Sequence, residues 1–182
     1  FERPVIVPEA IEWARLVSLD FETFYDADYT LSKLSTSEYI RDPRFEALMV
    51  GVKIGNGKTR VIPGNKLKAE LKKIPWETHS LLCHHMLFDG FIMSHHYGIH
   101  PKRLYCTLSM ARGLHSNDIG AGLDEVSVFY GGHGKLEGGV EGMKGIHFKE
   151  LWANKPLWEK SARYCANDVD EMLRVFKCML PK

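Results

Sequence analysis

The sequence has few cysteines, almost no net charge and no long apolar run. Its four cysteines are scattered and none forms a Cys-x-x-Cys pair, so we expect reduced core thiols of an intracellular protein instead of a disulfide framework. A formal net charge of +1 excludes a strong global attraction for polyanions. We find neither a signal peptide nor a run of about twenty apolar residues, so secretion and membrane insertion are not expected.

Signatures of zinc binding and of nucleotide binding are also missing. The chain has nine histidines, including two adjacent pairs, but their spacing fits no zinc-finger or metalloprotease motif. The glycine-rich segment 131–145 contains a Gly-Gly-His-Gly-Lys run without the frame of a phosphate-binding loop. We predict that this segment is a flexible surface connector, with a gate over the substrate as the alternative.

What is present indicates a single α/β domain over residues 1–182, with residues 1–14 as an N-terminal leader. At 182 residues and 45% hydrophobic content, the chain is long enough to bury a proper core. The apolar patterns predict a mixed sheet of about five strands flanked by helices. Predicted strands are 16–20, 47–54, 59–62, 80–84 and 104–107, and predicted helices are 66–74, 88–97, 124–130 and 158–180, with a looped or partly helical insert at 26–43.

An Asp-Phe-Glu motif follows the first apolar run, residues 16–19. Because strand side chains alternate, Asp20 and Glu22 project from one face and Phe21 faces the other. Two neighbouring carboxylates at the end of a buried strand repel each other unless a cation or hydrogen-bond donors compensate. The motif therefore favours a metal site, although an isolated Asp-x-Glu is more often a solvated strand end.

Further acidic positions lie on predicted helices. Tyr164 and Asp168 are four residues apart on the C-terminal helix, so both lie on one face. Asp170 and Glu171 are competing ligands, but neither stacks one turn after the tyrosine. Asp89 lies in the first turns of the helix after the fourth predicted strand, where open α/β sheets place their ligands. Taken singly, Asp168 could simply lie on the solvent-exposed side of its helix, and Asp89 could merely complement the helix dipole.

In this order, the motifs resemble the DEDD (DnaQ-like) superfamily of 3′→5′ exonucleases, in its tyrosine-containing branch. Asp20 and Glu22 match the family's Asp-x-Glu, and Asp89 matches the Asp of its second motif. Tyr164 and Asp168 match its Tyr-x-x-x-Asp. The resemblance is nearest to the proofreading domain of family A (pol I-type) DNA polymerases, of the bacteriophage type, and it implies a ribonuclease-H-like fold.

The resemblance implies hydrolysis of the 3′-terminal phosphodiester that releases nucleoside 5′-monophosphates. The resemblance also implies that Asp20, Glu22, Asp89 and Asp168 are the metal ligands. Their hard oxygens suit two divalent ions, Mg²⁺ or Mn²⁺, better than Zn²⁺. Tyr164 is expected to orient the attacking water through a hydrogen bond. These five residues form the expected catalytic set.

The expected substrate is the 3′ end of single-stranded DNA. A terminal nucleotide must be splayed from its neighbour, so side chains near the carboxylates are expected to pack on it. Thr23, Phe24 and Phe88 are the candidates, with core packing as their alternative role. His85 stands where the family carries Asn, and it could donate a hydrogen bond to the strand. A charged histidine there would favour phosphate at low pH.

The resemblance also implies a wider setting. We expect a segment of a larger bacterial or phage-type DNA polymerase, with a polymerase domain on the same chain, acting as a monomer in the cytoplasm of a bacterial or phage-infected cell. Two alternatives stay open. One is a stand-alone DEDD exoribonuclease that trims RNA ends, because the same carboxylates serve either nucleic acid. The other is an inactive module that binds strand ends or a partner, for which His85 is the only indication.

Overall fold

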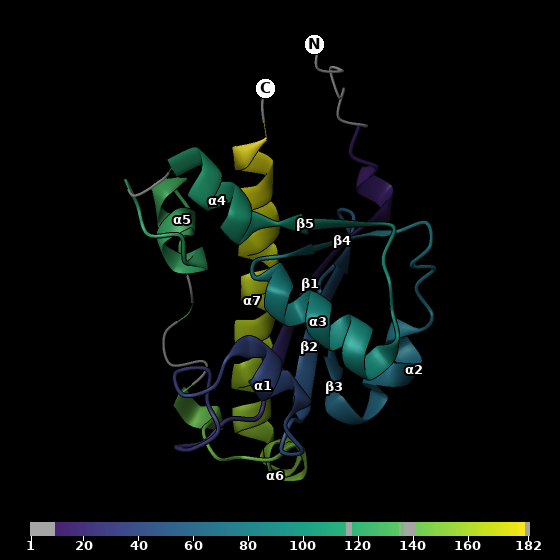
Figure 1. The fold of residues 1–182 in the computed structure, drawn as a ribbon, viewed down its shortest axis with the longest axis vertical. Coiled ribbons are helices and arrows are strands. Elements are labelled where there is room, and N and C mark those ends of the chain that lie inside the picture. The colour runs from purple at the N-terminus through teal and green to yellow at the C-terminus, as the bar shows by residue number, and fades with distance from the viewer. Residues whose placement is uncertain (1–9, 116–117, 135, 137–140, 181–182) are drawn as a thin grey trace.

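The computed structural model describes residues 10–115, 118–134, 136 and 141–180. Within these residues, five strands form one sheet in the order β3-β2-β1-β4-β5 (Figure 1). The strand β1 pairs antiparallel with β2 and parallel with β4, so the predicted mixed sheet is confirmed. The strands are β1 (Leu16–Thr23), β2 (Ala47–Ile54), β3 (Arg60–Pro63), β4 (Ser80–Cys83) and β5 (Arg103–Cys106).

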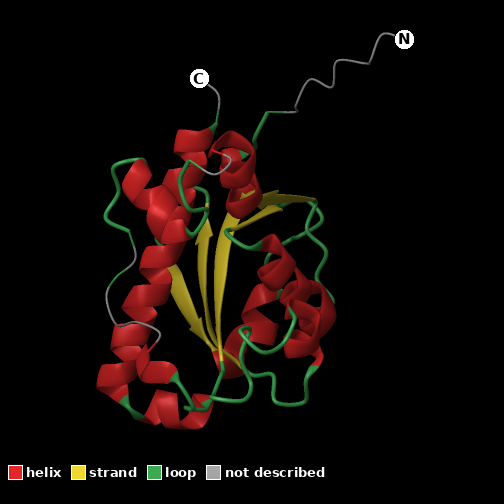
Figure 2. Cartoon of the chain, turned by 60° about the vertical axis from the view of Figure 1, so that its left-hand side comes forward, coloured by secondary structure: helices red, strands yellow, loops and turns green. Residues whose placement is uncertain are grey.

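Helices cover both faces of this sheet (Figure 2). One face carries α7, which packs on β1, β2 and β3, and the other carries α3, which packs on β4, β5 and β1. In the described part of the chain the helices are α1 (Thr36–Arg41), α2 (Leu67–Leu71), α3 (Met86–Tyr97), α4 (Thr107–His115), α5 (Leu123–Phe129), α6 (Phe148–Ala153) and α7 (Lys155–Met179), with 3₁₀ turns at Trp13–Arg15, Gly64–Lys66 and Glu141–Met143. None of these helices is long and apolar enough to cross a bilayer.

Local capping chemistry explains two helix starts that hydrophobic spacing did not locate. The insert 26–43 contains α1, which begins with a capping box between Ser35 and Glu38. The helix α7 begins three residues before the predicted start, because the Asn154 side chain accepts a hydrogen bond from Leu157 N at 3.2 Å and Pro156 lies in the first turn. The helices α4 and α6 were not predicted.

Alternation along β1 divides the buried core into two clusters. Leu16 faces α7 and packs in a cluster with Met172 and Phe176 of that helix. Val17 and Leu19 point to the opposite face and join the cluster that includes the α3 side chains of that face. Side chains at even positions of β1 therefore face α7, which directs Asp20 and Glu22 toward that helix.

The strand β1 is longer than predicted, and this decides where its acids lie. It continues through Thr23 instead of ending at Asp20, because it pairs with β2 from Val17 to Thr23. On its other side the parallel pairing with β4 ends at Ser18. The acidic motif thus lies on a stretch of β1 that is held by one neighbouring strand and open on the side of β4.

The predicted leader and the glycine-rich segment are only partly described. Residues 1–9 of the predicted leader lie outside the described residues, as do residues 135 and 137–140 of the glycine-rich segment. The described start of that segment is held by hydrogen bonds. Gly134 N donates to Ser127 Oγ at 3.1 Å, and Asn167 Nδ2 donates to Gly134 O at 3.2 Å. This part of the segment is anchored to α5 and α7.

Gly51 allows α7 to lie close to the sheet. It pairs with Asp20 across the β1–β2 ladder. A Cβ atom at this position would lie 2.7 Å from Val169 Cγ2 and 3.1 Å from the main-chain oxygen of Cys165, both in α7. Because a side chain could not be accommodated without a shift, glycine at this position lets α7 pack directly over the strands that carry the acidic motif.

We expect Gly51→Ala to destabilise the fold by about 1–3 kcal/mol, the usual cost of overpacking. Gly113→Ala is the matched control: Gly113 lies inside α4, and an added Cβ would have nothing within 4 Å. The control should leave stability unchanged or raise it by up to about 1 kcal/mol, since alanine favours helix. Urea denaturation measures both changes. A Gly51→Ala variant as stable as the wild type would show that α7 can shift without cost.

Candidate active site

The five residues of the expected catalytic set line one cavity of about 210 Å³. They come from three elements that are far apart in the sequence: β1, the first turn of α3 and the middle of α7. The cavity lies where the part of β1 beyond its pairing with β4 meets the start of α3. Its lining consists of Asp20, Phe21, Glu22, His84, His85, Phe88, Asp89, Leu123, Tyr164 and Asp168.

Asp89 connects α3 to the sheet. Its Oδ1 accepts a hydrogen bond from Phe21 N at 3.1 Å, beyond the last residue of β1 that pairs with β4. Asp89 is only 2% exposed. Burial, and then the negative charge of Asp20, raise the pKa of Asp89 well above the usual carboxyl range, while the bond from Phe21 N opposes this rise. Such a pair of carboxylates is stabilised by a cation.

The helix α7 supplies Tyr164 and Asp168, which are both buried and line the cavity. The two competing acids on this helix lie elsewhere. Asp170 is exposed and forms an ion pair with Lys53 at 2.7 Å. Glu171 pairs with an arginine one turn further along the helix. The one-turn spacing from Tyr164 therefore selects the acid that faces the cavity.

Three of the four predicted substrate-binding residues line a cavity. Phe88 and His85 line the acidic cavity, and Thr23 lines a neighbouring cavity of about 230 Å³. The two cavities share Phe88 together with Phe21 and Glu22. The second cavity also has tyrosine, threonine and leucine side chains in its wall, so it offers packing surface next to the carboxylates. Its further lining residues are Tyr25, Thr30, Leu31 and Tyr39.

Phe24 is placed differently from the expectation and packs in the core. It is 4% exposed, its ring stacks on that of His147 with centroids 4.0 Å apart, and it lines neither of these two cavities. The strand bulge between Glu22 and Thr23 shifts the register just before Phe24. We therefore no longer include Phe24 among the candidate substrate contacts.

His85 and His84 form the wall of the acidic cavity just before α3. Burial, and then the positive charge of Arg112, lower the pKa of His85, so its neutral form dominates at pH 7. From the sequence, a protonated His85 was considered as a contact to phosphate. This protonated form therefore requires a lower pH than for an ordinary histidine. His84 Nδ1 lies 2.8 Å from Thr107 Oγ1, which holds the ring in place.

Sequence reasoning did not assign a role to His84 or to Leu123 in this cavity. Leu123 opens α5, and α5 is held against α7 in part by a hydrogen bond from Arg174 Nη2 to Ser127 O at 2.9 Å. The local sequence around Leu123 does not show that it lines the cavity, because its position depends on this contact between helices. The adjacent histidines were a visible signal for His84, but His84 itself was considered only as a zinc ligand.

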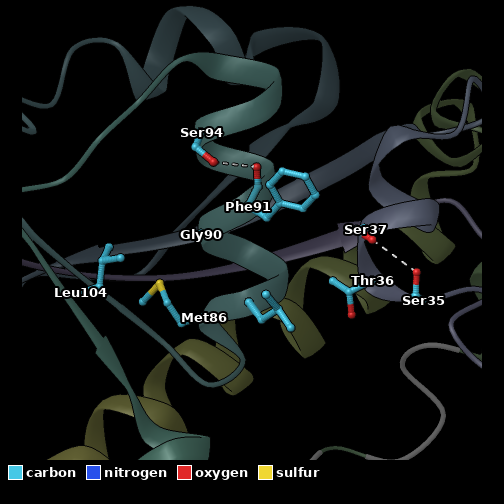
Figure 3. A pocket seen from close by; sticks show the side chains of 9 residues that line it. Ser35, Thr36, Ser37, Met86, Gly90, Phe91, Ser94 and Leu104 are labelled. Atoms are coloured by element: carbon cyan, nitrogen blue, oxygen red, sulfur yellow. Dashed lines mark hydrogen bonds between the residues drawn. The ribbon is translucent and has the colours of Figure 1, made fainter.

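A larger groove of about 740 Å³ lies on the outer side of α3 (Figure 3). Hydroxyl residues before and in α1 line one side, while Phe91, Met86 and Leu104 provide apolar surface. Its lining contains no carboxylate or histidine, so it lacks the groups needed for metal-dependent hydrolysis. The full lining is Ser35, Thr36, Ser37, Met86, Leu87, Gly90, Phe91, Ser94 and Leu104.

A family model described as 3′–5′ exonuclease matches residues 14–182, which is nearly the whole chain. The chain belongs to this 3′–5′ exonuclease family. The motifs that suggested an exonuclease from the sequence and the cavity that they line are therefore parts of an exonuclease domain. No curated protein sequence matches the chain.

Solved structures confirm the ribonuclease-H-like fold of this exonuclease. Brucella melitensis NrnC with bound Mg²⁺ has 19% sequence identity and a TM-score of 0.64, over 91% of this chain and 72% of that chain. Trypanosoma brucei RNase D has 15% identity and a TM-score of 0.66, over 93% of this chain and 58% of that chain. At these identities the likeness establishes the fold alone.

The acidic cavity of the exonuclease fits divalent metal ions. Its four carboxylates offer hard oxygen ligands of the kind that Mg²⁺ and Mn²⁺ prefer. Burial and the negative charge of Asp20 both raise the pKa of Asp89, so the two carboxylates repel each other when both are charged. A divalent cation would offset this repulsion, so Asp20, Glu22, Asp89 and Asp168 are the residues that could hold it.

In EDTA at neutral pH, we expect Asp89→Asn to melt at a higher temperature than the wild type. The amide carries no charge, and its oxygen can still accept the bond from Phe21 N. The folded-state pKa of Asp89 lies above that of the unfolded chain, so the metal-free wild type should lose stability as the pH rises from about 4 through the raised value. Thermal melts across this pH range measure the slope, which should be smaller in the variant.

Asp118→Asn, at an exposed position, serves as the control and should follow the wild type at every pH. Added Mg²⁺ should stabilise the wild type and the control more than Asp89→Asn. Identical melting curves for Asp89→Asn and the wild type at all pH values would contradict the proposed charge repulsion.

Proposed function

We propose that this exonuclease uses two divalent ions to remove nucleotides one at a time from the 3′ ends of RNA. The convergence of four carboxylates and Tyr164 in one cavity is the observation that carries this proposal. The choice of RNA is supported by the fold neighbour from T. brucei, which is named as a ribonuclease. This supports the stand-alone ribonuclease alternative more than the proofreading expectation.

Different residues of the chain act on the phosphate, on the attacking water and on the terminal nucleotide. Divalent ions bound by the carboxylates would lower the pKa of a water molecule and offset charge on the departing 3′ oxygen. Tyr164, buried beside the carboxylates, orients the attacking water through its hydroxyl group. Phe88 and the neighbouring cavity hold the terminal nucleotide apart from its neighbour. His85, in its neutral form, offers one ring N–H to the strand.

Trimming of DNA 3′ ends, as in polymerase proofreading, is the second candidate. It is supported by the order of the three motifs, which is nearest to that of family A DNA polymerases. The carboxylates would act on the phosphodiester through the ions that they hold and not on the sugar, so they serve either nucleic acid. Discrimination would have to come from the walls of the two cavities, where a 2′-hydroxyl group can be contacted.

A direct comparison of substrates tests the proposal. With Mg²⁺ or Mn²⁺, we expect a 5′-labelled RNA oligonucleotide to be shortened stepwise from its 3′ end, faster than DNA of the same sequence. Asp168→Asn should lower the rate at least about 100-fold, since metal-assisted charge stabilisation contributes several kcal/mol. Asp170→Asn, two residues away on the surface, is the matched control and should retain the wild-type rate.

The outcomes separate the candidate functions. Faster digestion of DNA than of RNA would favour the second candidate, trimming of DNA 3′ ends. Equal loss of activity in Asp168→Asn and Asp170→Asn would contradict the placement of the catalytic site. Binding of either strand without any cleavage in Mg²⁺ or Mn²⁺ would favour the inactive-module alternative.

Tyr164→Phe should lower kcat by about 10- to 100-fold, the effect of a poorly positioned reactant. The variant keeps the ring and therefore its packing, and it loses only the hydroxyl group. Because Tyr164 is not expected to bind the metal, the Mg²⁺ concentration that gives half-maximal activity should stay unchanged. Steady-state kinetics over a range of Mg²⁺ concentrations measure both quantities. A large change in the metal requirement would instead place Tyr164 in the metal site.

A further inference from the structure

A buried thiol lies beside the two carboxylates of β1. The Sγ atom of Cys165 and one carboxylate oxygen from each of Asp20 and Glu22 all lie within 4.8 Å of one another. Cys165 follows Tyr164 on α7 and is fully buried. Its thiol donates a long hydrogen bond, 3.6 Å, to the main-chain oxygen of Asp20. The sulfur is therefore directed at the strand that carries the first acidic motif.

The close packing of α7 on the sheet keeps the thiol in this place. Gly51 lies next to Asp20 across the β1–β2 ladder, and a Cβ atom at Gly51 would be 3.1 Å from Cys165 Sγ. The sulfur therefore lies close to Gly51 of β2 and to Asp20 of β1, its pairing partner. Three donor atoms this close together can hold one ion.

The position of the thiol beside the carboxylates also affects its acidity. Burial first, and then the negative charges of Glu22, Asp20 and Asp168, raise the pKa of Cys165. A cation bound to these carboxylates would offset the charges that act on the sulfur. For a thiophilic ion, the sulfur–metal bond forms as the thiol proton leaves to solvent, so sulfur and carboxylates can share one ion.

We propose that Asp20, Glu22 and Cys165 form a mixed oxygen–sulfur site for one thiophilic divalent ion of the Zn²⁺ or Cd²⁺ class. A thiolate ligand favours these softer ions and contributes little to Mg²⁺ binding. Three protein ligands with a further position for water are typical of catalytic zinc sites. Because Asp20 and Glu22 also belong to the site of the proposed function, such an ion competes with Mg²⁺ there. The site was not expected from the sequence, where zinc ligands were sought among the histidines.

Cadmium provides a direct optical test, because a cadmium–thiolate bond absorbs in the ultraviolet through charge transfer from sulfur to metal. Titration of Cd²⁺ into the metal-free protein should give a band that saturates at one equivalent, and Zn²⁺ should remove it by competition. Cys165→Ala should abolish the band. Cys178→Ala, which removes an exposed thiol near the end of α7, is the control and should retain it.

A second variant tests the carboxylate side of the site while keeping all four thiols. Glu22→Gln should bind Cd²⁺ at least tenfold more weakly, as read from the same band. This variant decides the question alone if Cys165→Ala does not fold, which circular dichroism would reveal. A band of unchanged affinity in Cys165→Ala or in Glu22→Gln would overturn the proposal, since the ion would then bind at another thiol.

This optical test can fail or succeed independently of the exonuclease assay. A band that depends on Cys165 and Glu22, in a protein that digests neither RNA nor DNA with Mg²⁺, supports the mixed site and contradicts the proposed function. Stepwise digestion with Mg²⁺ but no saturable band supports the proposed function and overturns the mixed site alone.

Discussion

The hydrogen bond from Phe21 N to Asp89 Oδ1 is the contact on which the arrangement of the site depends. It satisfies a main-chain donor of β1 beyond the point where β4 stops pairing. A hydrogen bond of this kind contributes about 0.5–1.5 kcal/mol. It fixes the start of α3 against the sheet and brings Asp89 into the electric field of Asp20. The hydrogen bond that joins α3 to β1 therefore also places the Asp89 carboxylate where Asp20 repels it.

The packing around the site holds these acids in place. The sheet is packed on both faces, and Gly51 lets α7 approach the acidic strand closely. Close packing of this kind leaves side chains little room to move apart. The fold thus places four carboxylates around one cavity, where a divalent cation can offset their mutual repulsion, as metal-dependent hydrolysis requires.

The same close packing gives this chain a feature that the acidic motifs alone do not imply. With glycine at position 51, there is room for the Cys165 thiol between α7 and β1. A site made of oxygen ligands alone distinguishes ions mainly by size and charge, whereas an added sulfur makes it sensitive to softness. The choice of metal would then depend on the second residue of the Tyr-x-x-x-Asp motif, a position that carries no charge.

Much of the site was determined by the sequence itself. Alternation along a strand placed Asp20 and Glu22 on one face, and helical spacing placed Asp168 one turn after Tyr164, because both periods are local properties of the backbone. Five strands and their mixed pairing followed from apolar patterns of the same kind. Only the tertiary structure decided that Phe24 is buried, that Leu123 enters the cavity and that Cys165 lies beside the carboxylates. These outcomes depend on a strand bulge and on contacts between α5, α7 and the sheet, which join residues distant in sequence and leave no periodic signal in it.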